Sequence, residues 1–272
     1  MTKTILITGT SSGLGRATAK LFQAKGWNVI ATMRDPARET ELTNLPHTLV
    51  TRLDVQDVPS ITSAVEAGLA KFGRIDALVN NAGYGAYGPL EATSLESMRR
   101  QYDVNVIGLM ATTKALLPHF RVNHGGVIVN ISSMGGRIAF PTGALYHGAK
   151  FAVEGLSEAL QYELAPIGVR VKLIEPGMIN TDFGGRSLEH NNDTALTEYQ
   201  PLVQGMHQAL GAIAQQASSP EAIAEVIYSA ATDESDRLRY IAGADAEQII
   251  AARAALSDAD FFANLRRQFG IA

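Results

Sequence analysis

"TGTSSGLG", at residues 8–15, is a glycine-rich segment that follows an apolar run and opens an amphipathic stretch. Gly9 permits a tight turn, and Gly13 and Gly15 permit close approach of the backbone to a ligand and of a helix to a sheet. A helix that begins here presents free N–H groups and a positive dipole end to a pyrophosphate. The spacing G-x-x-x-G-x-G differs from the commoner G-x-G-x-x-G, and a plain strand–helix turn is the alternative interpretation. The segment predicts the phosphate end of a dinucleotide site.

Short β-branched runs alternate with amphipathic stretches along the chain. The runs lie at residues 4–8, 27–32, 48–53, 75–80, 126–132 and 169–175, and the amphipathic stretches lie at 13–25, 59–72, 95–117 and 147–165. Several runs are apolar at successive positions, as expected for strands that are covered on both faces. The alternation predicts an α/β fold of the Rossmann type, a doubly wound parallel sheet with helices on both faces.

The chain has no internal repeat, low-complexity tract or convincing linker. We therefore expect residues 1–272 to form a single dinucleotide-binding domain. Residues 180–215 begin with polar sequence, including "EHNNDT", and then become helix-like. An interruption of this length is more often a functional cover than a domain boundary, so we expect it to lie over the substrate.

Composition narrows the classes of function. The chain carries a net charge of -4, 46% apolar residues and no cysteine, which excludes disulfides and thiolate chemistry. No Lys/Arg run indicates a nucleic-acid or anionic-membrane surface, and no apolar run approaches the roughly 20 residues that span a bilayer. The N-terminus lacks a signal peptide, and the six histidines show no metal-binding spacing. We expect a cytoplasmic protein without a metal ion.

The second predicted strand ends in "ATMRDP", at residues 31–36, where the ribose of the adenosine should lie. Asp35 could accept hydrogen bonds from a ribose 2′-OH, which would favour NAD. Arg34 could pair with a 2′-phosphate, which would favour NADP. Met33 occupies the end of the strand, where a ribose-binding acid belongs, and Asp35 before Pro36 suits a helix N-cap. We therefore favour NADP(H) over NAD(H).

With these features the sequence resembles the short-chain dehydrogenase/reductase family. The matching motifs are "TGTSSGLG" (8–15), "LDV" (53–55), "NNAG" (80–83), "NVIG" (105–108), "NISS" (130–133), "YHGAK" (146–150) and "PGMINT" (176–181). They occur in the family's order and spacing over about residues 4–181. The resemblance implies a sheet of about seven strands, a nicotinamide cofactor, and hydride transfer at an alcohol or carbonyl carbon.

Four residues are the candidate catalytic set: Asn105, Ser133, Tyr146 and Lys150. Tyr146 and Lys150, four apart, share one helix face. A free phenol titrates near 10, and a nearby cation lowers that pKa, so this pair suits an acid/base and its activating charge. The hydroxyl of Ser133, at a strand end, can bind the substrate oxygen. The resemblance gives Lys150 a contact with the nicotinamide ribose, selects Ser133 over Ser132, and assigns Asn105 a structural and proton-relay role through water.

The family's commonest motif is Y-x-A-S-K, and here Gly148 and Ala149 replace its Ala and Ser. Both functional side chains remain, so catalysis is not placed in doubt. A glycine within a helix costs about 1 kcal/mol relative to alanine, unless it permits close packing. His147, beside Tyr146, is expected to point elsewhere on the helix.

The resemblance also implies contacts with the cofactor, taken residue by residue. The resemblance implies cofactor contacts at Ser11, Ser12, Leu14, Asp54, Val55, Asn81, Ala82, Gly83, Pro176, Gly177, Ile179 and Thr181, besides the glycines, Arg34, Tyr146 and Lys150. For Asp54, a loop cap is the alternative. Candidate substrate contacts beside Ser133 and Tyr146 are Met134, Phe140, Met178 and Phe183, with Tyr84, Leu145, Tyr199 and Met206 as further candidates. Each could equally be local core.

We expect a small-molecule alcohol or carbonyl substrate, with steroid, retinoid, aliphatic and aromatic compounds all open. The resemblance also suggests a homodimer or homotetramer. A different class of function is a catalytically silent NADP(H)-binding regulator or sensor. Such a protein needs only the phosphate end and could lose the tyrosine or lysine, whereas this chain keeps both.

Overall fold

The computed structural model describes residues 2–214 and 217–270. Its centre is a seven-stranded, fully parallel sheet with the strand order β3-β2-β1-β4-β6-β7-β9. The strands are β1 (Thr4–Ile7), β2 (Asn28–Met33), β3 (Thr48–Arg52), β4 (Ala77–Asn80), β6 (Gly126–Ile131), β7 (Val169–Pro176) and β9 (Arg239–Ala242). The predicted α/β fold is confirmed, and each predicted strand appears within two residues of its expected bounds. The last strand lies at the sheet edge, after the charge-rich segment 233–239.

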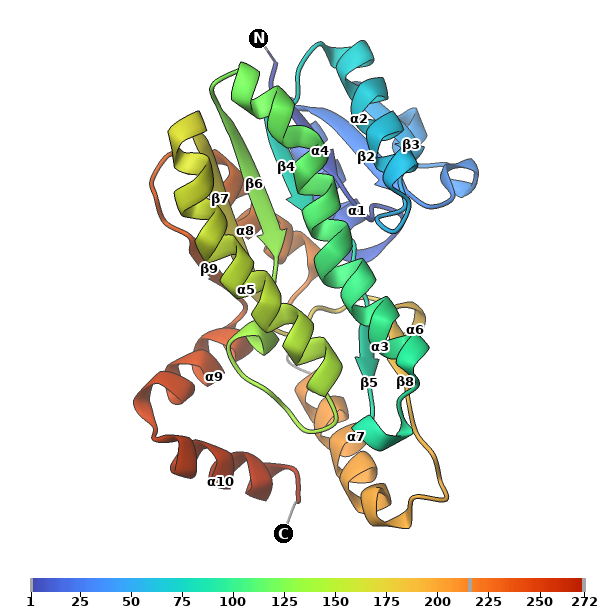
Figure 1. Cartoon of the computed structure of the whole chain (residues 1–272), viewed down its shortest axis with the longest axis vertical. Coiled ribbons are helices and arrows are strands. Elements are labelled where there is room, and N and C mark those ends of the chain that lie inside the picture. Colours follow the sequence, from blue (N-terminus) through green and yellow to red (C-terminus); the bar gives the residue numbers. More distant parts are fainter. Residues whose placement is uncertain (1, 215–216, 271–272) are drawn as a thin grey trace.

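Helices cover both faces of the sheet (Figure 1). The main ones are α1 (Gly13–Ala24), α2 (Val58–Phe72), α3 (Leu95–Tyr102), α4 (Gly108–Val122), α5 (Ala144–Leu164) and α8 (Pro220–Thr232). Successive side chains of a strand point to opposite faces. Ile5 and Ile7 therefore pack with α1 and α8, while Leu6 packs with α2 and α4. The core thus has two layers, one on each side of the sheet.

Local sequence explains where these helices begin and end. In α2, the Asp57 carboxylate accepts the N–H of Ser60, and a proline occupies the first turn. The helix stops at Gly73, whose φ of +80° is the left-handed conformation that glycine adopts readily. The continuous helix expected over 95–117 is instead α3 and α4, joined by a π-helical segment at Asp103–Ile107.

Further elements gather beyond the carboxyl ends of the strands (Figure 1). They are β5 (Gly85–Tyr87), β8 (Leu188–His190), α6 (Phe183–Arg186), α7 (Gln200–Ala214), α9 (Ala244–Ala255) and α10 (Asp258–Gln268). Strands β5 and β8 pair in parallel as a separate two-stranded sheet. A third apolar cluster joins Met134 and Met206 to Phe261, Leu265 and Phe269 of the C-terminal region. The described part of the segment 180–215 and the C-terminal helices thus lie at the carboxyl edge of the sheet (Figure 1), and the role of this segment as a substrate cover stays a prediction.

Within the described ranges, no helix is both long and apolar enough to cross a bilayer.

Candidate active site

The glycine turn takes the shape that its spacing requires. Gly9 and Gly13 have φ values of +72° and +53°. A Cβ on Gly15 would lie 2.5 Å from the amide nitrogen of Asn81, so only glycine fits there. Gly13 faces Thr181, whose Cγ2 would be 3.3 Å from an added Cβ, so the turn meets the segment after β7. The structure thus brings the two ends of the predicted cofactor site together.

The start of α1 suits a negatively charged ligand. Ser12 is its N-cap residue, with no side-chain capping bond among the described residues, and the first turn contains no acid. The first N–H groups of this helix are therefore left for an external acceptor, and the helix dipole favours an anion there. This geometry fits the pyrophosphate of a dinucleotide.

Some of the predicted cofactor residues also make hydrogen bonds that stabilise the glycine turn or their own loops. The Asn81 amide donates to the carbonyls of Thr8, at 2.9 Å, and Gly9, at 3.1 Å. Asp54 accepts the N–H of Gln56 at 3.1 Å, which is the loop-cap arrangement. Val55 packs against the start of α4, where a Cβ added to Gly108 would lie 2.6 Å from the Val55 Cβ. The other predicted residues lie at the ends of β1, β4 and β7, in the loops that follow them or in the first turn of α1: Ser11, Leu14, Ala82, Gly83, Pro176, Gly177 and Ile179.

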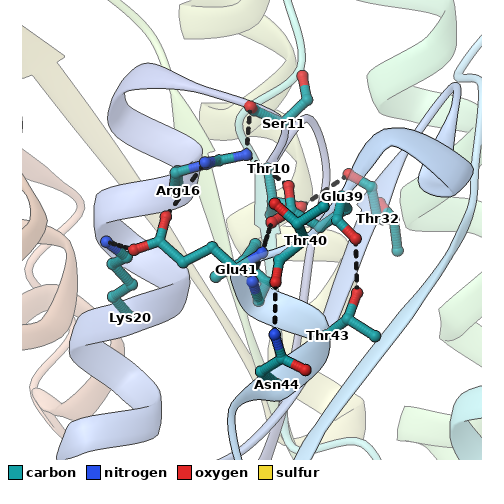
Figure 2. A network of polar contacts seen from close by, with 11 residues as sticks. Thr10, Ser11, Arg16, Lys20, Thr32, Glu39, Thr40, Glu41, Thr43 and Asn44 are labelled. Atoms are coloured by element: carbon teal, nitrogen blue, oxygen red, sulfur yellow. Dashed lines mark hydrogen bonds and ion pairs between the residues drawn. The ribbon is translucent and has the colours of Figure 1, made fainter.

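A polar network lies beside the end of β2 (Figure 2). Arg16 pairs with Glu39 and, at 3.1 Å, with Glu41, which also pairs with Lys20. The Glu39 side chain is only 1% exposed and also accepts the N–H groups of Glu41 and Leu42 at 2.9 Å each. These contacts tie α1 to the loop that follows β2. No sequence signal indicated Arg16, because its partners come from a loop without a periodic pattern.

Arg34 differs from its neighbours in this loop. Its side chain is exposed, and in the part of the chain that the structure describes it has no carboxylate partner. Asp35 and Arg38 instead pair with each other at 3.0 Å. Asp35 precedes Pro36 as the N-cap residue of a short 3-10 helix, as expected, although its side chain makes no capping bond there.

Tyr146 and Lys150 lie on one face of α5, at its N-terminal end. The Lys150 nitrogen is 5.7 Å from the centre of the Tyr146 ring and donates to the carbonyl of Ile131 at 2.8 Å. Burial lowers the pKa of Lys150 to about 8, and the Glu154 carboxylate opposes that shift. Burial raises the pKa of Tyr146, against a hydrogen bond with the Ser133 hydroxyl that lowers it.

Ser133 stands at the end of β6, as predicted, where it caps the short helical turn Met134–Gly136. Its Oγ accepts the N–H of Gly135 at 2.9 Å. Ser132 is turned away: its hydroxyl donates to the buried Glu154. The structure therefore brings Ser133, and not Ser132, to Tyr146.

Asn105 lies in the π-helical segment and is 3% exposed. Its side chain accepts the N–H of Tyr84 at 3.0 Å and donates to the carbonyl of Tyr84 at 2.8 Å. These bonds fix the chain that leads into β5. Single π-helical turns are frequent at functional sites.

The expectation for His147 is wrong. The ring does not point away from the site but packs edge-on against Tyr146, Tyr87 and Phe140, with centroid distances of 5.7, 5.9 and 5.5 Å. It is 3% exposed. The turn of residues 134–140 packs against this ring, a contact between distant segments that helical spacing does not reveal.

The candidate substrate residues separate into two groups. Phe183 is 37% exposed, with its ring 6.4 Å from that of Tyr146, so it borders the site. The apolar cluster under α9 and α10 contains the others: Met134, Phe140 and Met178, together with the further candidate Met206.

The other further candidates lie apart from Tyr146 or within the first turn of α5. Tyr84 is buried beneath Arg100, and the hydroxyl of Tyr199 donates to Glu91. Leu145 is half-buried in the first turn of α5.

A hollow beside Tyr87 is lined by Met206, one of the further candidates, and by residues that the sequence did not indicate. Tyr87 lies 5.4 Å from Tyr146, ring centre to ring centre. The hollow is lined by Tyr87, Thr142, His190, Asn191, Met206 and His207. The His190 and His207 rings lie 5.3 Å apart, and burial together with His207 lowers the pKa of His190. None of these residues belongs to a motif, and they come from β5, from β8 and the loop after it, from α7 and from the loop before α5.

Comparisons with known proteins agree with this geometry. The family profile described as short chain dehydrogenase matches residues 3–192. An uncharacterized oxidoreductase of Schizosaccharomyces pombe is 45% identical over 239 residues, which cover 88% of this chain and 100% of the relative. An NADPH-dependent 3-dehydrocapnine reductase of Ornithobacterium rhinotracheale is 34% identical over 87% of this chain and 86% of the relative. The crystal structure of a short-chain dehydrogenase from Streptomyces avermitilis, 34% identical, superposes with a TM-score of 0.83 over 98% of this chain and 95% of that one.

The parallel sheet, with its glycine turn and its tyrosine–lysine pair at the carboxyl edge, defines a Rossmann-type oxidoreductase. The chain belongs to the short-chain dehydrogenase/reductase family. Enzymes of this family use NAD(H) or NADP(H), and the open start of α1 and the left-handed Gly9 and Gly13 fit such a dinucleotide.

Proposed function

We propose that the protein transfers a hydride between NADP(H) and the carbon of a secondary alcohol or ketone, with Tyr146 as the acid/base. The observation that carries this proposal is the grouping of Tyr146, Lys150 and Ser133 at the carboxyl edge of the sheet, the edge at which the glycine turn also lies. An acid/base, its activating cation and a hydroxyl for the substrate oxygen are what alcohol–carbonyl interconversion requires.

The side chains divide the chemistry between them. When bound, the nicotinamide supplies or takes up the hydride. In reduction, Tyr146 gives its proton to the developing alkoxide; in oxidation, it removes the hydroxyl proton. The Lys150 ammonium favours the phenolate form, and the Ser133 hydroxyl holds the substrate oxygen. Asn105 fixes the chain that leads to Tyr87, and in this proposal it also supports water-mediated proton transfer to Lys150.

The choice of NADP(H) rests on the loop after β2. Arg34 has no carboxylate partner among the described residues, whereas the Asp35 carboxylate, the alternative ribose ligand, is engaged by Arg38 at 3.0 Å. A guanidinium grips a phosphate with paired hydrogen bonds, so Arg34 suits a 2′-phosphate. The relative from Ornithobacterium rhinotracheale is named as NADPH-dependent, which supports the same choice.

The substrate should be a small alcohol or carbonyl compound that meets Phe183 and Tyr87 beside the phenol. We also propose that the protein assembles as a homodimer or homotetramer through α4 and α5. Large apolar side chains are exposed on these helices and the segment before them: Ile107 at 51%, Met110 at 39%, Phe151 at 48% and Tyr162 at 82%. A cluster of this kind is typical of a contact surface between protein chains.

A screen of steroid, retinoid, aliphatic and aromatic carbonyls for oxidation of NADPH, followed at 340 nm, tests the function. Turnover of at least one class supports the enzyme. The competing hypothesis, a silent NADP(H)-binding sensor, predicts saturable cofactor binding with no turnover on the whole panel. Running the screen in parallel with NADH tests the cofactor choice.

A further inference from the structure

His147 is a buried side chain that the proposed chemistry does not use. Its Nδ1 lies 3.0 Å from the carbonyl oxygen of Gly135. Its Nε2 is buried and has no hydrogen-bond partner among the residues that the structure describes. A carbonyl only accepts, so Nδ1 carries the proton in this contact. Burial lowers the pKa of His147 to about 4, so the ring is neutral and Nε2 carries none.

The space around the imidazole is shaped to the ring. A Cβ on Gly135 would lie 2.7 Å from Nδ1, and a Cβ on Gly143 would lie 2.5 Å from Nε2. Both positions therefore need glycine for the ring to enter. Tyr87 and Phe140 pack against it edge-on. The ring is held in one orientation, with Nδ1 directed at the 134–136 turn.

The Gly135 residue connects this ring to Ser133. Its carbonyl accepts from His147 at 3.0 Å, while its N–H donates to the Ser133 hydroxyl at 2.9 Å. We infer that His147 is a positioning residue, which acts through Gly135 to fix Ser133 against Tyr146. Because His147 directly follows Tyr146, one helical turn sets both the acid/base and the group that binds the substrate oxygen.

The contact also restricts the Ser133 hydroxyl. The Gly135 N–H occupies one of the two lone pairs of its oxygen and leaves the second lone pair and the O–H available. A donor at that place is what a substrate carbonyl or developing alkoxide needs. The Gly135 carbonyl and N–H belong to successive peptide units, and the turn is also held by the Gly136 N–H, which donates to the Ser133 carbonyl at 2.8 Å. Without the His147 bond we expect this turn to hold the Ser133 hydroxyl less firmly.

Variants at His147 test this role, which rests on the proposed function. His147→Leu keeps the volume and removes the donor, whereas His147→Asn keeps an N–H near the position of Nδ1. We expect H147L to lower kcat on the order of tenfold, as small displacements of catalytic groups do, with little change in the KM for NADPH. We expect H147N to restore most of that loss. Wild-type kcat in H147L, or equal loss in H147N and H147L, would overturn the inference.

A double-mutant cycle separates positioning from general destabilisation. If His147 acts through Ser133, then in a Ser133→Ala background H147L should cost almost nothing more. Multiplicative losses would show that the two act independently. His119→Leu is the matched control: that ring also bonds a backbone group, the N–H of Ile75 at 3.1 Å on the far part of α4, and its loss should leave kcat unchanged.

The contact itself can be tested without turnover. In the wild-type protein at pH 7, ¹⁵N chemical shifts of the His147 ring should report a neutral imidazole protonated at Nδ1. A ring protonated at Nε2, or at both nitrogens, would contradict the inference whatever the substrate proves to be. Conversely, the expected tautomer in a protein without turnover on the panel would refute the proposed function and leave the contact intact.

Discussion

The side-chain nitrogen of Lys150 lies 5.7 Å from the centre of the Tyr146 ring, one helical turn along α5. The lysine is only 8% exposed, and its nitrogen also donates to the Ile131 carbonyl at 2.8 Å. Burial raises the pKa of Tyr146 and the Ser133 hydroxyl lowers it, and in the proposed function a charged Lys150 favours the phenolate further.

The pH dependence of reduction should report this cation. Burial lowers the pKa of Lys150 to about 8, so its charge is present below that pH and is lost above it. We expect kcat/KM for carbonyl reduction, which reports ionisations of the free enzyme, to fall as pH rises through about 8. In Lys150→Met, kcat/KM should be lower by about 10²-fold or more and should no longer fall in this pH range. If kcat/KM of Lys150→Met still fell in the same range, the fall would belong to another group.

Arg34 should determine the preference for NADPH. Removing a hydrogen bond to a charged group costs about 1.5–3 kcal/mol, so Arg34→Ala should raise the KM for NADPH roughly 10- to 100-fold. The KM for NADH should change little. Arg38→Ala is the control, because Arg38 lies in the same loop but pairs with Asp35. A clear preference of the wild type for NADH, or equal effects of both substitutions, would refute the role of Arg34.

Glu39, at the centre of the network in Figure 2, should anchor the loop after β2, and Arg34 belongs to that loop. Its buried carboxylate binds Arg16 and two backbone N–H groups, so Glu39→Ala should lower the free energy of unfolding by about 2 kcal/mol. Urea denaturation measures this loss. Glu41→Ala removes an exposed partner of the same network and should change stability little. Similar midpoints for both variants would argue against the network as the anchor of the loop.

The Tyr102 hydroxyl should account for the glycine at position 148 of α5. A Cβ at Gly148 would lie 2.5 Å from the hydroxyl oxygen of Tyr102, on the neighbouring α3. Gly148→Ala in the wild type should therefore lose most of the roughly 1 kcal/mol that helix propensity offers. In a Tyr102→Phe background the same change should recover it. Thermal or urea unfolding of the four proteins gives the coupling; simple additivity would mean that Tyr102 does not restrict the site.

Much of the architecture could be predicted, because its signals are local. Buried strands such as residues 77–80 are apolar at successive positions, and the glycine turn must adopt φ angles that only glycine favours. The Tyr146–Lys150 pair follows from helical spacing in the same way. In each case neighbouring residues carry the whole signal.

The features that the sequence did not predict depend on contacts between distant segments of the chain. Strands β5 and β8 are three residues each and pair across a long stretch of chain, so neither shows an apolar run. The direction of His147 follows from the turn at residues 134–140, not from its own helix. The partners of Arg16 come from an irregular loop. Pairings of this kind leave no periodic trace in a single sequence.

Tyr146→Phe tests the central claim most directly. This change removes one oxygen and keeps the ring that packs against Tyr87 and His147. With NADPH and the best carbonyl from the screen, kcat should fall by about 10²- to 10⁴-fold, the usual contribution of a general acid, while the Kd for NADPH stays within experimental error of the wild type. Turnover at the wild-type rate in Tyr146→Phe would contradict the account.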